Sequence, residues 1–86
     1  MDKLIIYINE KKLVIYKEDN KYYYDTKELD YNLVEEFVSK LIKICRTRER
    51  MNNRSNHKIE IYNGNDITIL TGIDNQVIKY INSFLK

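Results

Sequence analysis

The residues best suited to chemistry in this sequence form one arginine-rich segment. All four arginines of the chain fall within nine residues, and Asn and Ser residues lie between and after them. A guanidinium group can pair with a phosphate or a carboxylate through two parallel hydrogen bonds, whereas an ammonium group acts as a point charge. The segment therefore predicts contact with a nucleic-acid backbone or an acidic protein surface. The predicted contact residues are Arg46, Arg48, Arg50, Arg54, His57 and Lys58.

The charge of the chain is distributed unevenly. Residues 1–38 carry six lysines and nine carboxylates, a net charge of −3. Residues 39–58 carry seven basic side chains and one acidic side chain, a net charge of +6. Residues 59–86 carry two basic and three acidic side chains, a net charge of −1. A solvated helix end explains the same cluster without a ligand, because cations are favoured at helix C-termini. The restriction of arginine to this segment favours a binding role.

An enzymatic hypothesis uses the same segment. Metal-independent ribonucleases need only Arg, His, Tyr and Lys side chains, but these groups must converge in space. The single histidine, His57, lies in a polar stretch, and the single cysteine, Cys45, lies on the apolar face of an expected helix, which is typical of a buried thiol. The sequence has no glycine-rich phosphate loop and no Asp-x-Asp-x-Asp loop. We therefore expect no catalytic residue, metal or cofactor, and a ribonuclease is the least favoured alternative.

The hydrophobic pattern indicates the elements that position this segment. Alternating apolar residues predict strands, and apolar spacings of three and four predict helices capped by Asp30 and Asp74. We expect strands at residues 3–9, 13–16, 21–25, 58–62 and 67–70, a helix from Asp30 to near residue 46, and a helix from Asp74 to residue 85. The expected apolar stripe of the first helix is Leu33, Val34, Phe37, Val38, Leu41, Ile42 and Cys45.

The order β-β-β-α-β-β-α predicts an α+β fold. We expect a two-layer sandwich in which two helices cover one face of an antiparallel sheet of about five strands. The length suits a single domain over residues 1–86. Residues 3–45 and 58–86 are weakly similar, which suggests duplication of a ββα unit.

The strand alternation also predicts the face of the sheet that the helices leave open. We expect the helices to cover Leu4, Ile6, Ile8, Leu13, Ile15, Ile59, Ile61, Ile67 and Ile69. The opposite face then carries Ile5, Tyr7, Val14, Tyr16, Glu60, Tyr62, Thr68 and Leu70. A face so rich in apolar and tyrosine side chains predicts an interaction surface, unless another element or lysine stems cover it. Tyr7, Tyr16 and Tyr62 are its predicted binding residues.

Composition bears on origin and compartment. The chain has no Ala, Pro or Trp and is rich in Ile, Lys, Asn and Tyr, which indicates an A/T-rich genome. Its longest apolar run, residues 4–8, is too short to span a bilayer, and the start of the chain lacks the pattern of a secretion signal. We therefore expect a cytoplasmic protein with no membrane contact. In size and composition alone, the chain resembles short proteins of phages and mobile elements, anti-CRISPR proteins among them, many of which inhibit host machinery by binding it.

These observations favour a binding protein over an enzyme. The leading hypothesis is an inhibitor or adaptor that blocks a nucleic-acid-handling protein, alone or bound to nucleic acid. Its contacts would be the arginine segment and the tyrosine-rich sheet face, because arginine and aromatic side chains dominate many interfaces. The alternative is direct binding of RNA or DNA, with arginines on phosphates and tyrosines stacked on bases. Homodimerisation through the sheet face stays open.

Overall fold

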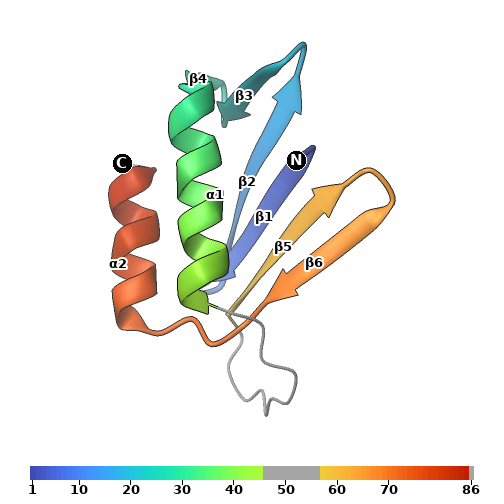
Figure 1. Cartoon of the computed structure of the whole chain (residues 1–86). Helices are drawn as coiled ribbons and strands as arrows, with labels where there is room; N and C mark the ends of the chain where they lie inside the picture. The colour runs from blue at the N-terminus through green and yellow to red at the C-terminus, as the bar shows by residue number, and fades with distance from the viewer. Residues whose placement is uncertain (46–56, 86) are drawn as a thin grey trace.

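In the part of the chain that the structure describes, the fold is a six-stranded antiparallel sheet with two helices packed against it (Figure 1). The computed structural model describes residues 1–45 and 57–85. The elements are β1 (Lys3–Ile8), β2 (Lys11–Glu18), β3 (Lys21–Tyr24), β4 (Lys27–Leu29), α1 (Tyr31–Cys45), β5 (Lys58–Asn63), β6 (Asp66–Leu70) and α2 (Asn75–Phe84). The predicted α+β class is confirmed, with one strand more than expected. None of the described helices is both long and apolar enough to cross a membrane.

The sheet order β4-β3-β2-β1-β5-β6 places the first strand at the centre. Strand β1 pairs with β2 on one side and with β5 on the other, so it joins the two halves of the chain. The turns Asn9-Glu10 and Asp19-Asn20 connect β1 to β2 and β2 to β3, and all four residues have positive φ. Two consecutive left-handed residues suit the twist of a tight antiparallel hairpin.

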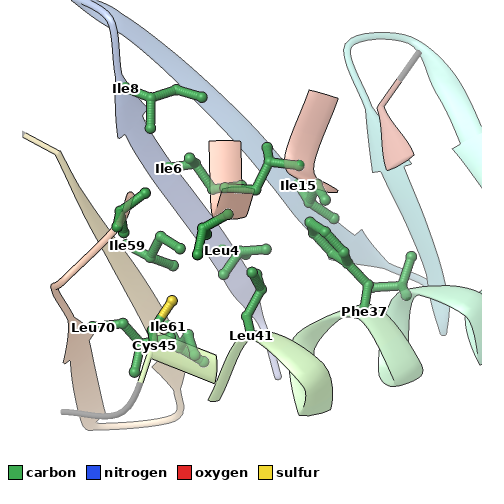
Figure 2. Packing of buried hydrophobic residues seen from close by; sticks show 14 of the residues in the cluster. Leu4, Ile6, Ile8, Ile15, Phe37, Leu41, Cys45, Ile59, Ile61 and Leu70 are labelled. Carbon is green, nitrogen blue, oxygen red and sulfur yellow. The ribbon is translucent and has the colours of Figure 1, made fainter. Parts of the chain in front are cut away.

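The core lies between the helices and one face of the sheet. Leu4, Ile6 and Ile15 from the central strands point toward the helix layer, where Phe37 and Leu41 of α1 meet them (Figure 2). The ring of Phe37 stacks on that of Phe84 in α2, with centroids 4.0 Å apart and planes 5° apart. Phe37 therefore joins α1, α2 and the sheet in one cluster.

Both predicted helix caps are confirmed. The backbone N–H of Leu33 donates a hydrogen bond of 3.0 Å to Oδ1 of Asp30, and that of Val77 donates one of 3.0 Å to Oδ1 of Asp74. Each carboxylate accepts from an N–H group that has no partner within its own helix. The two aspartates therefore define where the helices begin.

The apolar stripe of α1 is narrower than predicted. Val34, Phe37, Leu41 and Cys45 are buried and Val38 is partly buried, but Leu33 is 54% exposed and Ile42 is 46% exposed. Only residues close to one line along the helix reach the sheet, and Leu33 and Ile42 lie toward opposite sides of that line. These two residues are therefore not core residues.

The face assignment predicted for the last strand is wrong by one residue. Tyr62 lies opposite Ile67 and Glu60 opposite Ile69, so Ile67 and Ile69 share the face that the helices leave open. Thr68 and Leu70 instead lie on the helix side, where Leu70 is fully buried. The reason is the two-residue turn between Asn63 and Asp66, which fixes the register of the hairpin.

The additional strand, β4, is short and carries little hydrophobic signal. It pairs with β3 through Lys27 opposite Tyr24 and Leu29 opposite Tyr22. The chain reverses at Asp25, which has a φ of +67°. Three residues with two charges have too little alternation to predict a strand, and pairing with β3 determines the conformation.

Candidate functional site

The two predicted surfaces differ in what the structure describes of them. Arg46, Arg48, Arg50 and Arg54 lie outside the described residues. His57 is partly buried just before β5, and Lys58 is the first residue of β5. The predicted tyrosines Tyr7, Tyr16 and Tyr62 all lie on the sheet face turned away from the helices, as expected. Their role in binding stays a prediction.

This face, called here the open sheet face, carries three rows of side chains that cross β1, together with the pair Glu18 and Lys21 on β2 and β3. The long row contains Glu28, Tyr23, Tyr16, Lys3, Tyr62 and Ile67. The middle row contains Val14, Ile5, Glu60 and Ile69. The short row contains Lys12, Tyr7 and Lys58. The middle row is mostly apolar, whereas tyrosine and lysine dominate the other two.

Contacts between neighbouring side chains orient the tyrosine rings. Nζ of Lys3 lies 5.1 Å from the ring centroid of Tyr62, and Nζ of Lys58 lies 5.1 Å from that of Tyr7. Ammonium groups at this distance are attracted to the face of an aromatic ring. Tyr16 and Tyr23 stack with their centroids 5.6 Å apart. The rings are therefore held in place before any partner binds.

Glu60 is the polar centre of the open sheet face. Its Oε1 accepts hydrogen bonds from the hydroxyls of Tyr62 at 2.8 Å and Tyr7 at 3.5 Å, and its Oε2 lies 3.2 Å from Nζ of Lys58. Burial of the Glu60 carboxyl raises its pKa, but the hydrogen bonds from Tyr62 and Lys58 outweigh burial and hold the pKa below its ordinary value. The hydrogen bond to Glu60 in turn raises the pKa of Tyr62.

Outside the Glu60 cluster, two lysines of this face keep an unpaired positive charge among the described residues. Lys58 neutralises the carboxylate, whose side chain is only 13% exposed. Among the described residues, neither Lys3 nor Lys12 forms an ion pair. An approaching partner therefore meets tyrosine rings and the exposed side chains of Ile67 and Ile69, with the ammonium groups of Lys3 and Lys12 beside them and the carboxylate of Glu28 at the β4 end.

The lowered pKa of Glu60 predicts a pH-dependent contribution to stability. A carboxyl group with a lowered folded-state pKa stabilises the fold above its ordinary value of 4.5, and the contribution is lost as the pH falls through the folded-state pKa. We expect the native protein to exceed Glu60→Gln in free energy of unfolding at neutral pH, and the gap to close in acid. Urea unfolding across this pH range measures the gap.

The matched control for this prediction is Glu28→Gln. Glu28 lies on the same face but outside the Glu60 cluster. Its substitution removes one carboxylate without breaking the bonds to Tyr7, Tyr62 and Lys58. A gap for Glu60→Gln that is absent at neutral pH, or that widens in acid, would contradict the stabilising role of the cluster.

Cys45 belongs to the core and not to this face. It is buried at the end of α1, and burial raises the pKa of its thiol to about 11, with the nearby charge of Asp74 acting in the same direction. A thiol in this setting is a poor nucleophile near neutral pH, so the expected buried thiol is confirmed. Within residues 1–45 and 57–85, no three side chains of His, Cys, Asp or Glu are grouped as metal ligands.

Several members of the open sheet face escaped the sequence-based prediction. Ile67 and Ile69 were assigned to the other face, and Tyr23, Lys3 and Lys12 were not singled out. The signal that could have placed the two isoleucines was the length of the turn after Asn63. A turn of two residues pairs Tyr62 with Ile67 and Glu60 with Ile69, so each isoleucine shares the face of its partner.

Comparison of the chain with protein-family models, with curated proteins and with solved structures gave no match. An inference about function therefore depends on the chemistry of the side chains described above.

Proposed function

We propose that this is a non-enzymatic binding protein that docks through its open sheet face onto a protein partner and blocks that partner's activity. The observation that carries the proposal is a sheet face with an apolar middle row between two rows of tyrosines and lysines, over which no described element lies (Figure 1). Within this face Ile5 is only 7% exposed, so the accessible apolar surface consists mainly of Ile67 (55% exposed) and Ile69 (49% exposed). Accessible apolar side chains gathered beside tyrosines mark an interaction site.

The tyrosines suit a protein interface for two reasons. Tyrosine offers a large, stiff side chain with a polar tip, and it is enriched where binding energy concentrates. The rings of Tyr7, Tyr16 and Tyr62 are already oriented by a lysine or a second tyrosine. Binding then costs less side-chain entropy than it would for free rotors.

The charges on the face indicate the chemistry of the partner. Lys3 and Lys12 lie beside the tyrosines without a carboxylate of their own, so a complementary surface would present acidic groups opposite these two lysines and an apolar patch opposite Ile67 and Ile69. The arginine segment, residues 46–58, is a proposed second contact on such an acidic partner. A protein that handles nucleic acid is the partner class that we propose.

The proposal is tested by comparing captures from a nuclease-treated bacterial extract. The baits are the immobilised native protein, Tyr16→Ala/Tyr62→Ala on the open sheet face, and Tyr31→Ala/Ile42→Ala on exposed positions of α1. We expect one protein to be retained by the native bait and by the α1 variant, and lost from the open-face variant. A protein lost equally from both variants would contradict docking through the open sheet face.

The alternation of tyrosine and lysine favours a second candidate, binding of single-stranded RNA or DNA. Bases can stack on tyrosine rings while ammonium groups contact phosphates, as on other sheet platforms. Lys12, Tyr7 and Lys58 form such a run in the short row. Labelled single strands would then bind tightly at about 50 mM salt and much more weakly at about 200 mM. No binding at the lower salt would dismiss this candidate.

A further inference from the structure

The two edges of the sheet differ in how well they are protected from pairing with another strand. Strand β4, at one edge, has only three residues, of which Lys27 and Glu28 are charged and exposed. Short length and charge are the usual means of blocking an edge. Strand β6, at the other edge, has five residues, of which only the first, Asp66, is charged.

Both faces of β6 are accessible next to this unprotected edge. Ile67 is 55% exposed and Ile69 is 49% exposed on the open sheet face, and Thr68 is exposed on the helix side. No described element lies beyond β6 in the sheet (Figure 1). A strand approaching this edge therefore meets apolar side chains and free backbone groups without an obstacle from the described part of the fold.

The register of the β5–β6 hairpin determines which backbone groups of β6 point outward. In an antiparallel pair, every second residue turns its N–H and C=O toward its neighbour, and the residues between turn theirs away. The two-residue turn makes Asn63 and Asp66 the closing pair. Asp66 therefore turns its N–H and C=O groups toward β5. Because the direction alternates along the strand, Ile67 and Ile69 turn theirs away from β5, toward the unpaired edge of the sheet.

We propose that two copies of this chain form a symmetric dimer by antiparallel pairing of their β6 strands about Thr68. In this register Ile67 of one copy lies opposite Ile69 of the other, and each such pair exchanges two backbone hydrogen bonds. All four isoleucines then meet on the open-face side. The two Thr68 side chains lie opposite each other on the helix side, and a cross-strand pair of threonines stabilises a sheet.

Self-complementarity is the reason to choose a second copy over an unrelated strand. A shift of the two-fold axis by one residue in either direction would place an isoleucine opposite Asn65 or Thr71 and lose one apolar pair. The Thr68-centred register also sets Asp66 opposite Leu70 of the second copy, so no like charges meet. The dimer has a continuous twelve-stranded sheet whose two open sheet faces lie side by side.

Sedimentation equilibrium on the full chain tests this dimer. We expect the native protein to approach twice the chain mass of 10.5 kDa as its concentration rises. Ile67→Lys/Ile69→Lys places like charges opposite each other in the proposed register and should give a monomer at every concentration. Ile67→Glu/Ile69→Lys places opposite charges in both pairs and should restore the dimer.

Two controls keep the test informative. Glu28→Lys adds a lysine to the other edge of the sheet and should leave the dimer unchanged. Circular dichroism should show that every variant is folded, because the side chains at positions 67 and 69 are exposed. A native protein that stays monomeric at millimolar concentration would overturn the proposal. Equal loss of the dimer in both double variants would overturn the Thr68-centred register.

Discussion

Replacing Phe37 by alanine should remove a large part of the stability of the fold. The side chain is 1% exposed, and its ring packs against Phe84 at 4.0 Å and Tyr80 at 5.3 Å between centroids. Truncating a buried phenylalanine costs about 3–5 kcal/mol because the cavity is only partly refilled. A chain of this size has a total of about 4–13 kcal/mol, at 0.05–0.15 kcal/mol per residue. For a domain whose free energy of unfolding lies near the lower end of this range, the loss is most of its stability.

Urea unfolding followed by circular dichroism measures this loss. The matched control is Leu33→Ala, which removes an apolar side chain from the same helix at a position that is 54% exposed. Its free energy of unfolding should stay within about 0.5 kcal/mol of the native value. A loss below about 1 kcal/mol for Phe37→Ala would contradict the role of this ring in joining α1, α2 and the sheet.

The double substitution Tyr16→Ala/Tyr62→Ala should weaken binding to the purified protein partner by about 30-fold to about 1,000-fold. Removing two central aromatic contacts of an interface costs about 2–4 kcal/mol. Tyr16 and Tyr62 flank Lys3 in the long row, so the variant removes ring surface on both sides of that cation. Isothermal titration calorimetry with each variant gives the dissociation constants.

Tyr31→Ala is the matched control for this binding prediction. Like Tyr16, Tyr31 is accessible and stacks on a neighbouring tyrosine, here Tyr22 at 4.9 Å, but it belongs to α1 on the opposite side of the sheet. We expect its dissociation constant to stay within about twofold of the native value. Equal weakening by Tyr31→Ala and by the double variant would indicate that the loss comes from reduced stability and not from lost contact.

The elements with strong local signals were predictable from sequence. The two helices follow from apolar spacing and from Asp30 and Asp74, whose carboxylates cap the first turns. Strand β4 was not predictable, because its three residues take their conformation from pairing with β3. The exposure of Ile42 was not predictable either, because the width of the stripe that a sheet buries depends on tertiary packing.

The candidate site was likewise predictable only in part, where its placement depends on local sequence and not on pairing between distant strands. Alternation alone placed Tyr7, Tyr16 and Tyr62 on one face, because a strand turns successive side chains to opposite sides. The Glu60 cluster had no local signal, since the hydroxyl of Tyr7 reaches a carboxylate 53 residues away. Only the pairing of β1 with β5 brings these groups together.

Site-specific photo-crosslinking tests the central claim most directly. A photoreactive phenylalanine analogue is introduced in place of Tyr16 on the open sheet face, and in a second variant in place of Ile42, which is exposed on α1. Both variants are irradiated in the same nuclease-treated bacterial extract. Docking through the open sheet face predicts a covalent protein adduct from position 16 and none from position 42. An adduct from position 42 alone would contradict it.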